Sequence, residues 1–190
     1  MHKKLIYTFL SLIFLLSCFS SCAKRAPDYL EYQSHSFIAK GHITYDGSDA
    51  EITVSLEKEN PPQSIYIRNG SIEFTAPSEL SGVTITFSED GTSISSGDVK
   101  IPIYTANLEI PNIISSLFSF EQSDISGITT KNNDTGIVDV IDVKNDLLSA
   151  QIHIDRKSFL PTKIIADIDS NSLTFDISNI EFTDTEENND

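Results

Sequence analysis

Apolar and polar residues alternate with a period of two over most of residues 36–182. Successive side chains of a β-strand point to opposite faces, so this alternation predicts strands with one buried face and one exposed face. Turn-forming pairs such as Asp46 with Gly47 separate the runs, and Asn69 with Gly70 predicts either a hairpin turn or a bulge in one long strand. We therefore expect about nine or ten strands, joined mainly by short turns into an antiparallel sheet.

One segment departs from this pattern and has helical spacing instead. The apolar residues Ile113, Ile114, Leu117 and Phe118 follow Pro111, a residue that suits the first turn of a helix. Because this helix is apolar on nearly all sides, we expect it to be buried against the sheet. The predicted fold class is α+β, mainly antiparallel β: a curved, half-open barrel with one or two short helices covering the concave face.

The first 22 residues have the pattern of a bacterial lipoprotein signal. Lys3 and Lys4 precede an apolar run over residues 5–16, which is shorter than the roughly 20 residues that a membrane-spanning helix needs. A serine then precedes each of two cysteines, Cys18 and Cys22. We favour Cys22 as the lipidated residue, with Cys18 as the alternative, because basic residues begin shortly after Cys22. An ordinary secretory signal with incidental cysteines is the remaining interpretation.

These features divide the chain into four parts. Residues 1–21 are the expected signal peptide, and residues 22–34 are the expected lipidated N-terminus and tether. Residues 35–183 are expected to form one β domain, since no long linker or internal repeat interrupts them. The acidic tail, residues 184–190, is expected to be disordered. The protein would then lie on the extracytoplasmic face of the cell membrane, held there by an N-terminal diacylglyceryl cysteine with palmitate-type chains.

The formal net charge of −15 narrows the choice of partners. Proteins that bind nucleic acids carry basic patches, so we expect no nucleic acid partner. Electrostatic adhesion to anionic lipid is disfavoured for the same reason, so the lipid on the cysteine would have to provide the anchor. No cysteine follows Cys22, so the processed domain has no disulfide and no thiolate metal site.

Motifs for catalysis or metal binding are weak. His35, His42 and His153 lack a second histidine at ligand spacing, so we interpret them as surface or structural residues. Residues 167–171 begin like a calcium loop, but serine stands where that loop needs glycine and glutamate, which favours a hairpin turn. The sequence contains no Gly-x-Ser-x-Gly, phosphate-loop or dinucleotide motif. We therefore expect no enzyme activity, no cofactor and no metal.

Three short segments resemble a known family. The segment IHIDRKSFLP, residues 152–161, resembles a strand, basic turn and Leu-Pro step of the LolA/LolB-like lipoprotein-carrier fold, and IEF at residues 180–182 resembles its closing strand. The segment FTAPSELSG, residues 74–82, is similar to a step in small Gram-positive lipoproteins, including clostridial spore-germination lipoproteins. This resemblance implies a LolA-like half-barrel with a groove on its concave face.

The leading functional hypothesis is a non-enzymatic lipoprotein that binds a hydrophobic ligand, an acyl chain or a lipidated protein, in this groove. A sheet with a broad apolar face and little helix to cover it motivates the hypothesis. The alternative, implied by the germination lipoproteins, is an adaptor that binds and stabilises an envelope protein such as a cell-wall or cortex hydrolase. If the apolar face holds a groove rather than only a packed core, we expect its lining to be Phe74, Ile85, Phe87, Ile113, Ile114, Leu117, Phe118 and Phe120.

Overall fold

The computed structural model describes residues 28–58, 68–88, 91–103, 109–133, 136–145, 149–168 and 171–184. Residues 1–27, which include the expected signal peptide and both cysteines, and residues 185–190 lie outside these ranges, so the expectations for them stay predictions. No helix among the described residues is long and apolar enough to cross a membrane. The elements in chain order are η1 (Glu31–Ser34), β1 (Phe37–Tyr45), β2 (Ser48–Leu56), β3 (Gly70–Ala76), β4 (Val83–Ser88), β5 (Gly91–Ser96), β6 (Val99–Ile103), α2 (Glu109–Leu117), η2 (Gln122–Asp124), β7 (Ile125–Asn133), β8 (Gly136–Lys144), β9 (Ser149–Asp155), β10 (Pro161–Ile168) and β11 (Asn171–Phe182).

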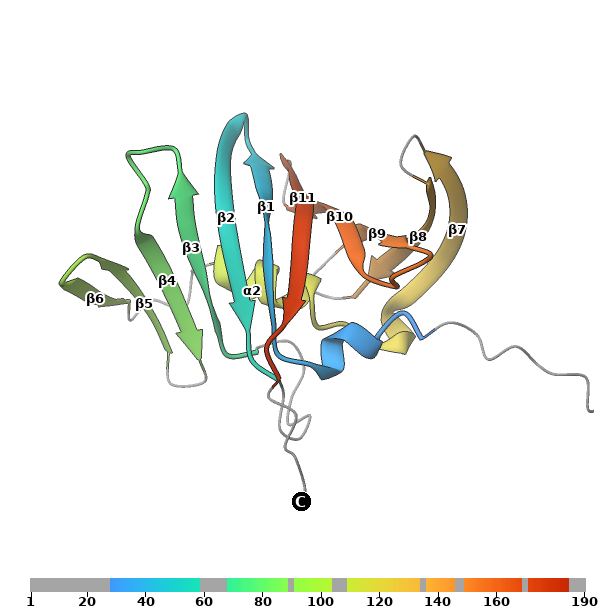
Figure 1. Ribbon diagram of the computed structural model, residues 1–190, viewed down its shortest axis with the longest axis horizontal. Coiled ribbons are helices and arrows are strands. Elements are labelled where there is room, and N and C mark those ends of the chain that lie inside the picture. Colours follow the sequence, from blue (N-terminus) through green and yellow to red (C-terminus); the bar gives the residue numbers. More distant parts are fainter. Residues whose placement is uncertain are drawn as a thin grey trace, which may run out of the picture.

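The strands form one antiparallel sheet of 11 strands in the order β6-β5-β4-β3-β2-β1-β11-β10-β9-β8-β7. Figure 1 shows that this sheet is open, with β6 and β7 at its two edges. The fold is thus mainly antiparallel β with very little helix, and the sheet does not close into a barrel. The sequence-based expectation of fewer strands misses β7, because Gly127 and the polar end of that strand, TTKNN, obscure its alternation.

The first and the last strand of the domain pair with each other in the interior of the sheet. Phe37 of β1 lies opposite Phe182 of β11, and Tyr45 lies opposite Leu173. On its other side β1 pairs with β2 through a tight turn, in which Asp46 and Gly47 have φ angles of 49° and 73°. Two successive residues with positive φ angles are typical of a two-residue hairpin turn, which the Asp-Gly sequence predicts. The sheet therefore consists of two meanders, β1 to β6 and β7 to β11, joined by the pairing of β1 with β11 (Figure 1).

The position of Gly70 excludes one of the two alternatives for Asn69 and Gly70, the hairpin turn. Gly70 is the first residue of β3 and pairs with Leu56 of β2, so Asn69 and Gly70 do not form a hairpin turn. The backbone of β2 approaches Gly70 so closely that a Cβ atom there would collide with the carbonyl oxygen of Ser55. The glycine is therefore needed for the close approach of two strands rather than for a change of chain direction.

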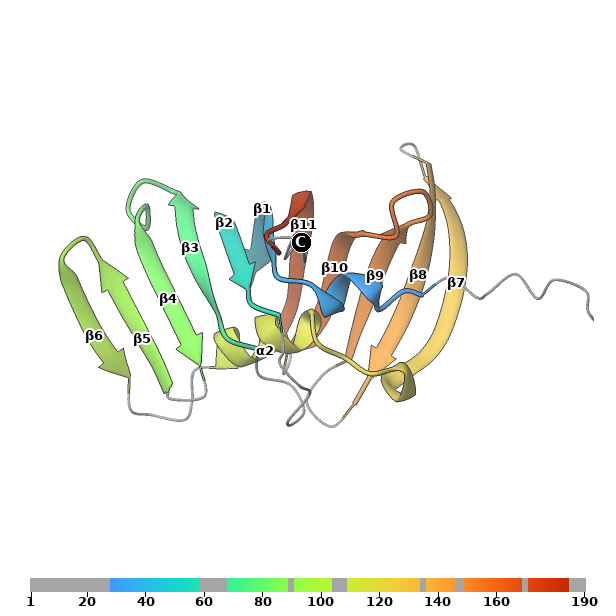
Figure 2. The same ribbon diagram turned by 60° about the horizontal axis from the view of Figure 1, so that its bottom comes forward.

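One face of the sheet, the inner face, carries the core. Figure 2 shows α2 lying across this face at the central strands, with η1 beside it toward β8 and β9. The helix begins at Glu109, slightly before the expected start at Pro111. Phe118, directly after the helix, makes edge-on ring contacts with Phe37 of β1 and Phe175 of β11, with centroids 5.3 and 6.3 Å apart. The predicted burial of this helical segment against the sheet is confirmed.

A second cover of the inner face comes from residues 28–36, the N-terminal segment. Its Tyr32 is buried, and burial raises the pKa of this phenol. The carbonyl oxygen of His35 accepts a hydrogen bond of 2.6 Å from Nη2 of Arg68. The backbone N–H of Arg68 in turn donates to Oγ of Ser115 in α2 at 2.9 Å. A single buried arginine therefore connects the two covers of the inner face.

Candidate functional site

A pocket of about 280 Å³ lies on the inner face, between α2 and the strands β1 to β3. Its volume is near the lower end of the range for small-molecule sites, about 300 to 1,000 Å³. Apolar side chains form most of the wall, and the β1–β2 turn contributes the polar part. The lining residues are Ile43, Tyr45, Asp46, Ser48, Asp49, Ala50, Ile52, Ile72, Phe74, Leu80, Ile113, Ile114, Ile168 and Leu173.

The turn between β3 and β4 places Leu80 at this pocket. Its backbone N–H donates to the carbonyl of Pro77 at 3.0 Å, and its own carbonyl accepts from Val83 N–H at 2.9 Å. Gly82, with a φ angle of 81°, closes the turn in a conformation that other residues rarely adopt. Because Leu80 is 40% exposed, its side chain forms part of the wall while bordering on solvent. A substitution at Leu80 can therefore change the pocket without removing a fully buried core residue.

The structure brings three of the predicted groove residues to this pocket: Phe74, Ile113 and Ile114. The other predicted lining residues are buried in the core with at most 8% exposure and do not line it, namely Ile85, Phe87, Leu117, Phe118 and Phe120. The segment around α2 thus provides both a packed core and one side of a pocket. Contact of any of these residues with a ligand stays a prediction.

Sequence reasoning missed the part of the pocket that comes from the end of the chain. Ile168 of β10 and Leu173 of β11 line it together with Ile43 of β1. They meet because β1 and β11 are neighbours, with Tyr45 directly opposite Leu173. The alternation marks these residues as facing one side of a strand, but it does not state which strands pair.

A buried carboxylate holds the N-terminal segment against the inner face near β8. Asp139 of β8 is 1% exposed. Its Oδ2 atom accepts hydrogen bonds of 3.0 Å from the Tyr29 hydroxyl and from Nε of Arg156, and its Oδ1 atom accepts one of 2.6 Å from Thr130. We call these four residues the Asp139 cluster.

The hydrogen bonds of the Asp139 cluster decide its charge state. Burial alone would raise the pKa of Asp139, but the hydrogen bonds from Thr130, Tyr29 and Arg156 outweigh it and hold the pKa below its usual value. Burial, followed by the hydrogen bond to Asp139, raises the pKa of Tyr29. At neutral pH the cluster is therefore an ionised carboxylate surrounded by three donors, an arrangement that suits a structural role.

The three histidines within the described residues, His35, His42 and His153, lie in different surroundings. His35 Nδ1 is 2.6 Å from Oδ2 of Asp184, and His42 Nδ1 is 3.1 Å from Oε1 of Glu51. The hydrogen bond that His42 donates to the Glu51 carboxylate raises the pKa of His42, whereas burial is the main cause that lowers the pKa of His153. Within the described ranges, no group of three histidine, cysteine, aspartate or glutamate side chains could hold a metal ion.

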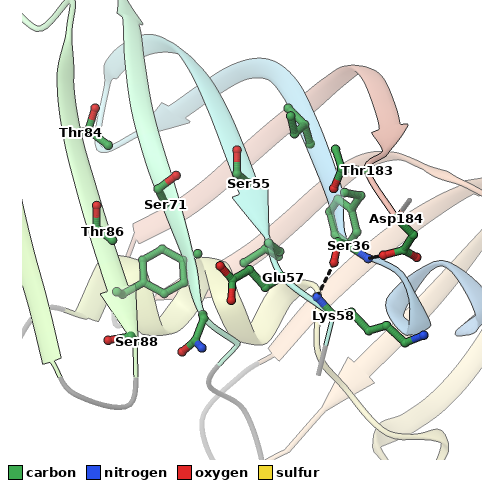
Figure 3. Close-up of a pocket in the computed structure, with 16 residues that line it drawn as sticks. Ser36, Ser55, Glu57, Lys58, Ser71, Thr84, Thr86, Ser88, Thr183 and Asp184 are labelled. Carbon is green, nitrogen blue, oxygen red and sulfur yellow. Dashed lines mark hydrogen bonds between the residues drawn. The ribbon is translucent and has the colours of Figure 1, made fainter. Parts of the chain in front are cut away.

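The opposite, outer face has a larger depression of about 1130 Å³ (Figure 3). Small hydroxyl side chains from neighbouring strands lie along it: Thr86 of β4 is opposite Ser71 of β3, which is opposite Ser55 of β2. At its border, Oγ of Ser36 accepts a hydrogen bond of 2.7 Å from the backbone N–H of Lys58. These hydroxyl groups favour contact with water, so the apolar inner-face pocket is the better candidate site.

Several solved structures are similar to this chain at low sequence identity. An uncharacterised conserved protein from Thermus thermophilus matches over 84% of this chain and 86% of its own, with 13% identity and a TM-score of 0.50. A LolA superfamily protein from Nitrosomonas europaea matches over 83% of this chain and 93% of its own, with 13% identity and a TM-score of 0.44. A chain of the Pseudomonas aeruginosa MucA/MucB complex matches over 84% of this chain and 58% of its own, with 12% identity and a TM-score of 0.45.

At these identities the likeness concerns the fold alone. A comparison of the sequence with protein-family models gives no match, and neither does a comparison with curated proteins. The resemblance to Gram-positive germination lipoproteins stays a prediction. The case for a function therefore depends on the pocket and its chemistry.

Proposed function

We propose that this chain is a membrane-anchored, extracytoplasmic protein that binds the apolar chain of a ligand, such as an acyl chain, in the inner-face pocket. The observation that carries the proposal is the pocket of about 280 Å³ with its mainly apolar wall. Water finds few hydrogen-bond partners against such a wall, whereas each buried methylene group contributes about 0.8 kcal/mol. A ligand chain that displaces this water is therefore bound favourably.

The polar end of the pocket favours a particular kind of ligand. Asp46, in the turn between β1 and β2, is among its lining residues. The carboxylate of a free fatty acid would lie near this charge and would be repelled by it. The carboxylate of Asp49 in β2 is directed to the outer face instead, because its Oδ1 accepts a hydrogen bond of 2.8 Å from Thr44, which alternates in β1 with the pocket residues Ile43 and Tyr45. We infer that the preferred ligand carries an uncharged head group or linkage beside its apolar chain.

The test measures binding of Nile red to residues 23–190, a length that includes every described residue. We expect the uncharged ester monodecanoylglycerol to displace the dye, and decanoate to displace it less effectively at neutral pH. The substitution Leu80→Asp places a charge at the pocket wall and should weaken binding of dye and ester by about tenfold or more. The matched control is Val99→Asp, the same change at a 61% exposed residue of β6 outside the pocket, which should leave binding unchanged.

Two results would contradict the proposal. One is that neither the dye nor the ester binds to the wild-type chain. The other is that Leu80→Asp and Val99→Asp weaken binding equally, because the dye would then be bound elsewhere. Isolation of the wild-type chain with an envelope protein and an empty pocket would instead support the adaptor hypothesis.

The anchor belongs to the proposal and is supported by the sequence of residues 1–22. Cells grown with labelled palmitate should label the wild-type chain and its Cys18→Ala variant but not Cys22→Ala. If the label is lost only in the Cys18→Ala variant, the lipid is attached to Cys18 instead. A wild-type chain without label would contradict lipid anchoring.

A further inference from the structure

The two edges of the sheet differ in what they offer to another strand. β6 and β7 are the end strands, and no strand within the described ranges pairs with their outer sides. In an antiparallel pair, alternate residues direct their N–H and C=O groups toward the neighbouring strand, and the residues between them direct these groups away. The register on the inner side of each edge strand therefore identifies its outward residues.

On β6 the outward positions are poorly suited to pairing. Ser96 and Val99 close the two-residue turn between β5 and β6, and such a closing pair exchanges hydrogen bonds. Lys100 and Pro102 are consequently the outward residues. Proline has no N–H to donate, so Pro102 cannot complete a ladder with another strand, and β7 contains no proline. The short β6 edge is thus protected.

On β7 the outward positions are open. Asn133 and Gly136 close the turn between β7 and β8, so they are the hydrogen-bonded pair at that end of the ladder. Counting back along the strand, Ile128, Thr130 and Asn132 direct their peptide groups away from β8. Each of these residues keeps both an N–H donor and a C=O acceptor, since none is proline.

The neighbouring ladder supports this assignment. The carbonyl of Ile137 accepts a hydrogen bond of 3.2 Å from Arg156 N–H, so Ile137 directs its carbonyl away from β7. Its partner Asn132 must then face outward. A bulge separates Ile125 from Gly127, and the register is regular from Gly127 to the end of β7. The regular part of the strand is long enough to pair with another strand.

The charge of β7 also differs from that of the whole chain. The formal net charge is −15, yet residues 125–133 contain no aspartate or glutamate, and Lys131 is their one charged residue. Ile128 is 46% exposed although it belongs to the apolar set of the inner face, where it lies opposite Ile141. An acid-free, partly apolar strand is the part of an acidic protein at which two copies repel each other least.

We propose that β7 is the interface for a second copy of this chain, whose own β7 adds to it in antiparallel orientation. In the proposed register, Thr130 of one copy lies opposite Thr130 of the other, and Ile128 lies opposite Asn132. The outward N–H and C=O groups of the two strands then form hydrogen bonds with each other. Lys131 lies opposite Thr129 of the second copy, so no like charges face each other. The arrangement uses one patch twice, as a two-fold symmetric dimer requires. This dimer proposal does not depend on ligand binding in the inner-face pocket.

The first test is the association of residues 23–190 with themselves, measured by sedimentation equilibrium from micromolar to millimolar concentration. A monomer–dimer equilibrium is the expected result. Amide hydrogen exchange then locates the contact: the N–H groups of Ile128, Thr130 and Asn132 should exchange rapidly in dilute solution and slowly in concentrated solution. The amide of Lys100 on the β6 edge serves as the internal control and should exchange rapidly in both.

The second test introduces at β7 the feature that protects β6. Ile128→Pro removes an outward donor without removing a hydrogen bond to β8, and should weaken the dimer by about tenfold to a hundredfold. The matched control Lys100→Pro makes the same change on β6 and should leave the dimer unchanged. If Ile128→Pro disturbs folding, Ile128→Lys places an edge charge in an intact strand and should also weaken the dimer.

Three outcomes would overturn the proposal. The wild-type chain could remain monomeric at every concentration. The dimer could form equally well with Ile128→Pro and Ile128→Lys, which would place the contact elsewhere. Finally, the three outward amides of β7 could show no protection in the concentrated sample.

Discussion

The two parts of the inner face are covered by different chemistry. In the helix half, α2 packs over β1 to β3 through apolar side chains, and a pocket of about 280 Å³ remains between them. In the segment half, the N-terminal segment reaches β8, where Tyr29 and two other donors bond to the buried carboxylate of Asp139. Apolar contacts are non-directional and allow an unfilled volume, whereas a buried charge needs all of its partners in place. The half that tolerates a gap is therefore the half that can accept a ligand.

The largest effect is expected where the two covers meet. Phe118 contacts Phe37 and Phe175 in the centre of the sheet and is fully buried. Phe118→Ala should lower the free energy of unfolding by about 3 to 5 kcal/mol, because it removes a large side chain and leaves a cavity. Urea denaturation measures this change. A loss below about 1 kcal/mol would mean that α2 is not fixed there.

The segment half should be sensitive to acid through Asp139. The pKa of this carboxyl is lower in the folded chain than its usual value of about 4, so its contribution is complete above that pH and is lost as the pH falls toward the folded value. Asp139→Asn should cost about 2 kcal/mol at neutral pH and should make unfolding less dependent on pH in the acid range. Unfolding curves at a series of pH values below 6 provide the measurement.

Tyr29→Phe is the control for that experiment. It removes one of the hydrogen bonds to Asp139 but keeps the carboxylate and its contact with Arg156. The expected loss is about 1 kcal/mol, with an acid dependence close to that of the wild type. Tyr29→Phe and Asp139→Asn could instead lower the free energy of unfolding equally and change its dependence on pH equally. That result would mean that the charge of Asp139 is not what distinguishes the segment half.

The contrast between the pocket and the packed core is tested by the same substitution at one residue of each. Ala50 lines the pocket of the helix half, whereas Ala166 of β10 is completely buried in the core. Ala50→Leu should fill empty space with a change of stability near zero, and it should abolish binding of Nile red. Ala166→Leu should destabilise by about 1 to 3 kcal/mol, because a filled core cannot take the added methylene groups. Equal thermal denaturation midpoints for the two variants would contradict the difference in packing.

How much of this could be predicted depends on whether a feature is local. The alternation of residues such as Ile52, Val54 and Leu56 predicted both the strand and its buried face, because the period of two is a property of adjacent residues. The helical spacing around Ile114 likewise predicted its burial. A run such as TTKNN carries no such alternation, and the strand β7 that contains it was missed.

Features that combine distant segments could not be predicted. The pocket joins Ile43 to Ile168 and Leu173, and the Asp139 cluster joins Tyr29 to β7, β8 and the turn after β9. A sequence pattern shows that each residue faces one side of its element, but it does not show which elements are neighbours. For the same reason, three of the predicted lining residues reach the pocket while the others belong to the core.

The pairing of β1 with β11 has a consequence for the time course of folding. Each meander can form from neighbouring hairpins, but His35 and Asp184, which meet at this junction, are 149 positions apart in the chain. Closing so long a loop is entropically costly and slow, as is typical of folds rich in non-local contacts. A chain that emerges from a secretion channel with its N-terminus first would expose the free edge of β1 until its last strand arrived. For a chain exported as proposed above, the junction at the middle of the finished sheet would therefore assemble last, and the edge of β1 would stay unpaired until then.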